Sequence, residues 1–101
     1  MQIKRLKKII VGDHDFDIIW EKDHSGGSFN YEKREIKIGT KNWEIRTLGV
    51  LIHELKEIIQ VEQCTRYERW DENKDFEFHY THKEHTQLCS MLAGLLSQFI
   101  N

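Results

Sequence analysis

Residues 48–59, LGVLIHELKEII, carry the pattern that decides the fold of this chain. Apolar side chains at i, i+3, i+4 and i+7 form one stripe on an α-helix, and that stripe can be buried against a core. The stretch therefore predicts an amphipathic helix, which we place at residues 44–62. The stripe consists of Leu48, Leu51, Ile52, Leu55, Ile58 and Ile59.

The residues before this helix alternate between apolar and polar types, as β-strands do. Residues 8–11 and 16–20 are rich in β-forming residues and flank a turn-forming cluster at 12–15. Alternation returns at residues 29–31 and 35–38. We expect two β-hairpins that form a small sheet. An amphipathic helix is the alternative for the start of the chain, with Ile3, Leu6 and Ile10 on one face.

The last part of the chain predicts a second helix. Thr81 and Glu84 have the Ser/Thr-x-x-Glu spacing of a capping box, and residues 64–80 before them are predicted to be a polar and aromatic connector. We expect the helix to run to the C-terminus. Its apolar residues are Leu88, Met91, Leu92, Leu95, Phe99 and Ile100. The pattern predicts an α+β fold, with a small N-terminal β-hairpin sheet packed with the first helix and a C-terminal helix, in one domain covering residues 1–101.

Composition and charge limit the kinds of partner and the cellular location that we expect for this chain. The formal charge of −2 and the pI near 6.3 predict no general attraction to nucleic acid or to an anionic membrane. No apolar run approaches the roughly 20 residues that span a bilayer, and no signal-peptide region follows the basic start. Cys64 and Cys89 are expected to be free thiols. We therefore expect a cytoplasmic protein without a membrane or nucleic-acid partner.

A possible catalytic group lies on the first predicted helix, away from its apolar stripe. His53 and Glu57 are four residues apart, so their Cβ atoms are about 5–6 Å apart and both side chains can reach one metal ion. Glu54 lies beside them and is a candidate general base, which would take a proton from metal-bound water. The alternative interpretation is a solvated helix face, because His and Glu are found at this spacing by chance in many helices.

The C-terminal helix is expected to cover the face of the first helix that carries His53 and Glu57, and to supply a third ligand. His85 precedes Leu88 by three residues and Leu92 by seven, which places it in line with the apolar stripe. His53, Glu57 and His85 would supply three protein ligands and leave a fourth position for water, as in catalytic zinc sites. The alternative third ligands, in order of preference, are His82, Glu84 and His79.

This pattern resembles the small zincin-like metallopeptidases, especially the ImmA/IrrE-type and related compact phage or prophage proteins. The resemblance rests on Ile36-Lys37-Ile38, on residues 51–54 (LIHE) and on a final helix with a ligand. It implies a zinc cofactor and hydrolysis of a peptide bond in a protein or peptide substrate. The family's helix usually reads HExxH and its later helix brings a glutamate. Here Glu57 gives HExxE, and His85 would take the place of that glutamate.

Two further interpretations remain open at the level of sequence. A noncatalytic interaction or regulatory module could keep the same scaffold, with or without metal. A basic aromatic group, Arg66, Tyr67, Arg69 and Trp70, is interspersed with acidic residues, which disfavours nucleic-acid binding. The candidates for stabilising an oxyanion are Tyr67, Tyr80, His79 and His82.

Overall fold

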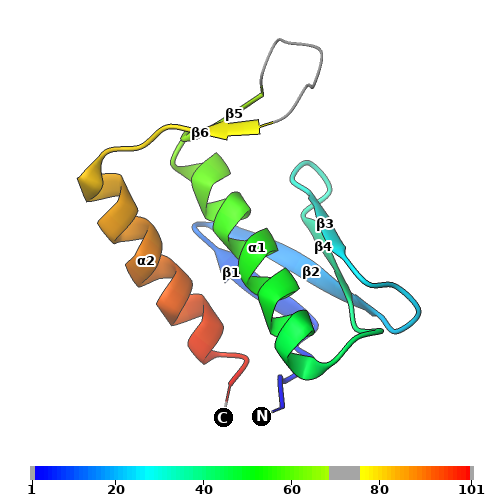
Figure 1. Ribbon diagram of the computed structural model, residues 1–101. Helices are drawn as coiled ribbons and strands as arrows, with labels where there is room; N and C mark the ends of the chain where they lie inside the picture. The colour runs from blue at the N-terminus through cyan, green and yellow to red at the C-terminus, as the bar shows by residue number, and fades with distance from the viewer. Residues whose placement is uncertain (1, 69–75, 101) are drawn as a thin grey trace.

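The computed structural model describes residues 2–68 and 76–100 of the chain. A four-stranded sheet comes first and the longer helix lies across it, with the second helix alongside (Figure 1). This arrangement confirms the α+β class. The strands are β1 (Lys8–Val11), β2 (His14–Glu21), β3 (Gly27–Asn30), β4 (Glu35–Gly39), β5 (Arg66–Glu68) and β6 (Phe76–Phe78), and the helices are α1 (Glu44–Glu62) and α2 (His82–Ser97).

The four-stranded sheet is built from the two predicted hairpins. Its strand order is β1-β2-β4-β3, with antiparallel pairs β1–β2 and β3–β4. The hairpins are joined by a parallel pairing of β2 with β4, in which Ile18 lies opposite Ile36. The alternative of a first helix is wrong, because β1 starts at Lys8 and Ile3 forms an isolated bridge with Ile100. This topology leaves β3 at one edge of the sheet.

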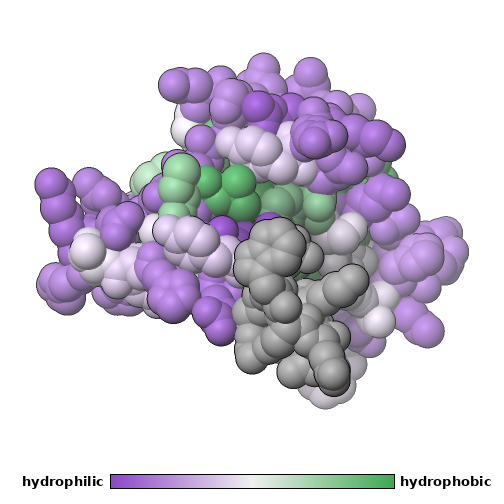
Figure 2. All heavy atoms as spheres, turned by 90° about the horizontal axis from the view of Figure 1, so that it is seen from above, coloured by the Kyte–Doolittle hydropathy of each residue, from purple (hydrophilic) through white to green (hydrophobic). Residues whose placement is uncertain are grey.

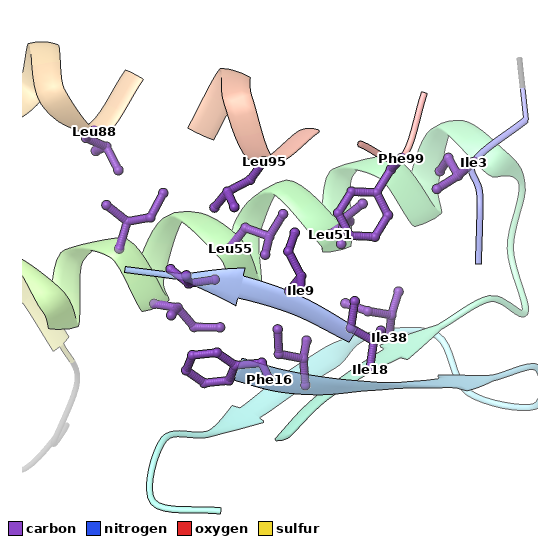
Figure 3. Close-up of a cluster of buried hydrophobic side chains, with 14 residues drawn as sticks. Ile3, Ile9, Phe16, Ile18, Ile38, Leu51, Leu55, Leu88, Leu95 and Phe99 are labelled. Carbon is purple, nitrogen blue, oxygen red and sulfur yellow. The ribbon is translucent and has the colours of Figure 1, made fainter. Parts of the chain in front are cut away.

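The core lies between one face of the sheet and the two helices (Figure 3). Alternate residues along β1, β2 and β4 are buried because successive side chains of a strand point to opposite faces. The α1 stripe meets them through four fully buried residues, while Leu48 and Ile52 are partly buried. The core comprises Ile3, Ile9, Val11, Phe16, Ile18, Ile36, Ile38, Leu51, Leu55, Ile58, Ile59, Leu88, Leu95 and Phe99.

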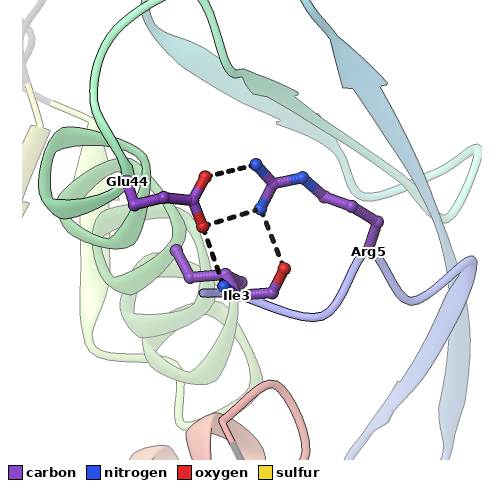
Figure 4. Close-up of polar contacts among 3 residues, drawn as sticks. All are labelled: Ile3, Arg5 and Glu44. Carbon is purple, nitrogen blue, oxygen red and sulfur yellow. Dashed lines mark hydrogen bonds and ion pairs between the residues drawn. The ribbon is translucent and has the colours of Figure 1, made fainter. Parts of the chain in front are cut away.

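Helix α1 has the predicted bounds, and its two ends are held differently. At the start, the Glu44 carboxylate accepts hydrogen bonds from the Ile3 backbone N–H (2.8 Å) and from the Arg5 guanidinium (2.5 Å) (Figure 4). At the end, Cys64 takes a left-handed conformation (φ 59°), and the Thr65 N–H donates back to the Gln60 carbonyl. The contacts to Ile3 and Arg5 therefore tie the start of α1 to the segment before β1, whereas the Thr65 hydrogen bond closes the last turn of the helix.

Helix α2 begins with the predicted capping box. The Thr81 hydroxyl accepts from the Glu84 N–H, and the Glu84 carboxylate accepts from the Thr81 N–H. The helix ends at Ser97, before the C-terminus, and Leu88 and Leu95 bury its apolar side next to α1. Within residues 2–68 and 76–100, no helix is both long and apolar enough to cross a membrane.

The predicted connector contains a short hairpin that the sequence pattern did not reveal. Arg66 pairs with Phe78 and Glu68 with Phe76, so β5 and β6 run antiparallel just beyond the end of α1. From the end of the molecule that carries this hairpin, the surface is mostly hydrophilic around a smaller apolar area (Figure 2). Arg69 and Trp70, which belong to the basic aromatic group, lie outside the described residues.

Candidate functional site

His53 and Glu57 come together on α1. The Nε2 atom of His53 lies 2.5 Å from Oε2 of Glu57, one helical turn later. The His53 side chain is 67% exposed and that of Glu57 is 14% exposed, so the pair spans the boundary between solvent and interior. The helical spacing thus brings the predicted pair into direct contact.

Glu54 is the buried member of the group. It is only 5% exposed, and its Oε2 lies 3.9 Å from His53 Nε2. Burial raises the pKa of Glu54 above its ordinary value. The nearby Glu57 acts in the same direction, while His53 and Arg66 oppose it. A carboxyl group whose charged form is disfavoured holds a proton more readily, as a general acid or base requires.

Strand β3 and the β5–β6 hairpin flank the face of α1 that carries His53 and Glu57. The sequence had predicted α2 at this place. A cleft of about 420 Å³, here called the aromatic cleft, lies between α1, β3 and β5–β6. The expected cover by α2 is wrong, because α2 packs on the apolar stripe of α1. The walls of the aromatic cleft include Gly27, Phe29, His53, Glu54, Glu57, Arg66, Phe76 and Phe78.

Gly27 allows β3 to approach α1 closely at the cleft. A Cβ atom at this position would lie 2.6 Å from Val50 Cγ1 and 3.2 Å from Glu54 Cγ. Contacts of 2.6 Å are not found for real Cβ atoms. The absence of a side chain at Gly27 therefore lets the strand lie directly over Glu54.

Arg66 is a site residue whose role the sequence analysis did not identify. Its Nε donates to Glu57 Oε1 at 3.0 Å, while Glu57 Oε2 faces His53. The Arg66 guanidinium also stacks on Phe76, with Cζ 3.5 Å from the ring centroid. The sequence signal for Arg66 was its place at the start of a group of basic and aromatic residues. Helical periodicity cannot assign the partner of a residue that lies outside the helix.

His85 does not join the His53–Glu57 pair. It is exposed and stacks on Tyr80, with 5.9 Å between ring centroids, while its Nε2 lies 3.7 Å from Cys89 Sγ on the same helix. The expectation that His85 points into the core is wrong. It lies at the border of the α2 stripe, and in the first turn of the helix that border faces solvent.

The alternative ligands and oxyanion candidates also lie elsewhere. His79 pairs with Glu77 at 3.0 Å, and His82 lies near His85, with 6.4 Å between ring centroids. Glu84 closes the capping box. Among the described residues, none of these side chains lines the aromatic cleft, and neither does Tyr67 or Tyr80.

A zinc ion fits this set of donors in part. Tetrahedral bonds of about 2.1 Å place two ligand atoms about 3.4 Å apart, so zinc would replace the 2.5 Å contact between His53 and Glu57. Arg66 occupies Oε1 of Glu57 and leaves Oε2 for a metal. Among residues 2–68 and 76–100, no three His, Cys, Asp or Glu side chains form a group that could hold a metal ion. The site thus offers two protein ligands, one fewer than a typical catalytic zinc site.

Comparison with protein-family models, curated protein sequences and solved structures finds no match for this chain. The geometry of the site is therefore the basis for assigning a function.

Proposed function

We propose that this chain is a zinc-dependent peptidase of zincin-like type, with its active centre at Glu54, His53 and Glu57. The observation that carries the proposal is the burial of Glu54 next to the converging His53–Glu57 pair, at the wall of a cleft. An ionisable group buried in a cleft, with a shifted pKa and a specific neighbour, is typical of catalytic sites.

His53 and Glu57 would hold the zinc through Nε2 and Oε2. When bound, zinc supplies a Lewis acid that lowers the pKa of water and polarises a carbonyl. Arg66 holds Oε1 of Glu57 and so orients the other oxygen, which is how groups beyond the ligands position a metal site. Glu54 would accept a proton from the attacking water and return it to the leaving amine.

The edge strand β3 supports a peptide as substrate. Within the described part of the chain, β3 pairs with β4 alone, and its other edge adjoins the aromatic cleft through Gly27, Ser28 and Phe29. An extended peptide can add to such an edge through main-chain hydrogen bonds. A peptide bound in this way would have one of its peptide bonds next to Glu54. We keep the cytoplasm as the proposed location, since Cys64 and Cys89 are free thiols.

A noncatalytic zincin-like interaction module is the second candidate. The contacts of Glu57 favour this candidate, because both of its carboxylate oxygens have partners within the protein: His53 at Oε2 and Arg66 at Oε1. A carboxylate with partners on both oxygens can have a purely structural role.

Zinc analysis and peptide digestion together separate the two candidates. Untagged protein is incubated with one equivalent of zinc, dialysed, and measured by elemental analysis. It is then incubated with a diverse peptide library that is read by mass spectrometry. Bound zinc with cleavage supports the peptidase. Bound zinc without any cleavage, or no bound zinc, favours the interaction module.

A further inference from the structure

The β5–β6 hairpin carries different side chains on its two faces. Because alternate residues of a strand point to opposite sides, Phe76 and Phe78 lie on one face of the hairpin. Arg66 is directly opposite Phe78 on β5 and lies on that face too, and all three residues line the aromatic cleft. Tyr67 and its cross-strand partner Glu77 lie on the other face. The hairpin therefore turns its phenylalanine face towards the proposed active centre.

The Arg66 guanidinium connects the three elements around the aromatic cleft. Its Cζ lies 3.5 Å from the ring centroid of Phe76 on β6 and 5.1 Å from that of Phe29 on β3. Its Nε donates to Glu57 on α1. Cations at these distances are attracted to the faces of aromatic rings. Arg66 thus holds the rings of Phe29 and Phe76 in position before a ligand enters, which lowers the cost of binding.

The phenylalanine side chains of the hairpin keep much of their surface in water. Phe76 is 41% exposed and Phe78 is 39% exposed, and both lie on the wall of the cleft that holds Glu54. Removing apolar surface from water is favourable, so an apolar group that enters the cleft and covers these rings gains free energy. Apolar side chains that line a concave site are typical of ligand sites.

The charge beside these rings is already matched within the protein. Arg66, which stacks on Phe76, forms an ion pair with Glu57 at 3.0 Å. A charged side chain that enters here would lose its water without a free ion partner in Arg66, and that loss is costly. An apolar side chain pays no such cost. The charges therefore favour an uncharged, apolar group at the phenylalanine end of the cleft.

A peptide paired with β3 would direct side chains into the aromatic cleft. Gly27 and Phe29 are two residues apart on β3, so they face the same side of the sheet. That side is the α1 side, because a Cβ atom at Gly27 would meet Val50 and Glu54. Every second side chain of an added strand would face the same way. One of them can reach the phenylalanine rings while a neighbouring peptide bond lies next to Glu54.

We propose that the aromatic cleft is a subsite for an aromatic or large aliphatic side chain of the peptide, which contacts Phe29, Phe76 and Phe78. This inference rests on the proposed peptidase function, because it names the substrate class of that centre: peptides with such a side chain close to the scissile bond. An aromatic side chain is preferred over an aliphatic one, since aromatic rings gain additional free energy from edge-to-face or offset contacts with one another.

Peptide titration followed by NMR tests the subsite without relying on hydrolysis. Three amidated peptides share one polar sequence and differ at a central position, which is phenylalanine, leucine or alanine. They are added to the zinc-free full chain. The phenylalanine peptide should bind most tightly and shift the ring signals of Phe78, and the alanine peptide should bind roughly tenfold more weakly. Equal affinities for these two peptides, or no binding of any peptide, overturn the proposal.

Dilution of the chain without peptide tests for a different occupant of the cleft. The ring signals of Phe76 and Phe78 should not depend on protein concentration. Signals that shift on dilution, together with a change of mass in sedimentation equilibrium, would place a second copy of the chain in the cleft and contradict the peptide subsite.

Variants on the two faces of the hairpin provide a matched comparison. Phe78→Ala should weaken binding of the phenylalanine peptide by roughly tenfold, whereas Phe78→Leu keeps an apolar side chain and should retain most of the affinity. Tyr67→Ala removes a ring that is 50% exposed from the other face and should not change binding. Equal binding by Phe78→Ala and Tyr67→Ala contradicts the subsite.

Hydrolysis of the same three peptides separates failure of the subsite from failure of the peptidase. Cleavage of all three at equal rates would contradict the subsite and leave the peptidase proposal intact. Tighter binding of the phenylalanine peptide, without cleavage of any peptide at full zinc occupancy, would support the subsite and contradict the peptidase. Tighter binding with faster cleavage of the phenylalanine peptide is the result expected if both hold.

Discussion

His53 Nε2 and Glu57 Oε2 lie 2.5 Å apart, which is direct contact and too close for two ligands of one zinc ion. The pair is therefore closed on itself, and zinc would have to open it. Because zinc must separate the two side chains and only these two protein donors would hold it, zinc affinity should be lower than at a site with three protein ligands.

Zinc binding should depend on the α1 pair and not on α2. His53→Ala and Glu57→Ala should each lower zinc affinity by more than the roughly 10–100-fold seen when only a supporting residue is lost. His85→Ala, which alters an exposed residue outside the aromatic cleft, should leave affinity unchanged. Competition titration against a zinc-binding dye measures all three variants. Loss of zinc in His85→Ala would restore the three-ligand hypothesis of the sequence analysis.

Arg66 should matter for zinc binding through the orientation of Glu57. Arg66→Gln removes the 3.0 Å contact to Glu57 Oε1 and should lower zinc affinity by about 10–100-fold. Arg66→Lys keeps the charge but loses the planar stacking on Phe76, so it should restore affinity only in part. Calorimetric titration of the two variants provides the comparison. An unchanged affinity in Arg66→Gln would show that Arg66 does not orient Glu57 for zinc, and a higher affinity would show that it competes with the metal.

The close approach of β3 to α1 should not tolerate a methyl group. Gly27→Ala places Cβ 2.6 Å from Val50 Cγ1 and 2.9 Å from the Lys37 carbonyl oxygen, so it should lower the free energy of unfolding by about 1–3 kcal/mol. Gly49→Ala is the matched control. A Cβ there meets no atom within 4 Å, so this helical substitution should raise stability by roughly 0.5–1 kcal/mol. Urea denaturation measures both, and a neutral Gly27→Ala would contradict the close contact.

The start of α1 should lose stability in acid. Hydrogen bonds from Arg5 and from the Ile3 N–H hold the pKa of Glu44 below its ordinary value. The stabilisation is therefore complete above the ordinary pKa of glutamate, about 4.3, and is lost as the pH falls through the lowered pKa. Glu44→Gln should lower the free energy of unfolding at pH 7 by up to about 1 kcal/mol, since the pair is partly exposed.

Denaturation at pH 7 and at pH 2 tests this dependence. The difference between wild type and Glu44→Gln should shrink in acid. Glu32→Gln, in an exposed turn, should match wild type at both pH values. A Glu44→Gln deficit of the same size at both pH values would mean that the ion pair is not its cause.

The sequence predicted the fold well where one local pattern suffices. The bounds of α1 followed from the apolar stripe, and the start of α2 followed from Thr81 and Glu84. The parallel pairing of β2 with β4 could not be predicted, because alternation identifies strands but not their neighbours. The β5–β6 hairpin was missed because each of its strands has three residues, too few to show a period.

The geometry of the candidate site could be predicted from the sequence only within one helix. His53, Glu54 and Glu57 share one helix, so their mutual geometry follows from helical spacing. Which element covers them depends on tertiary packing, and the sequence analysis chose α2 where β3 and β5–β6 lie. His85 was misplaced as a result, and Arg66 was not recognised as a partner of Glu57.

The hydrolysis rate of Glu54→Gln, relative to wild type, tests the central claim most directly. Glutamine keeps the shape of Glu54 and relieves the cost of a buried charge, so the variant should fold at least as stably and bind zinc equally well. Cleavage of the best library peptide at saturating zinc should fall by about 10²–10⁴-fold, because the general base is lost. If zinc-loaded Glu54→Gln cleaves that peptide as fast as wild type, Glu54 is not the base and the proposed active centre is wrong.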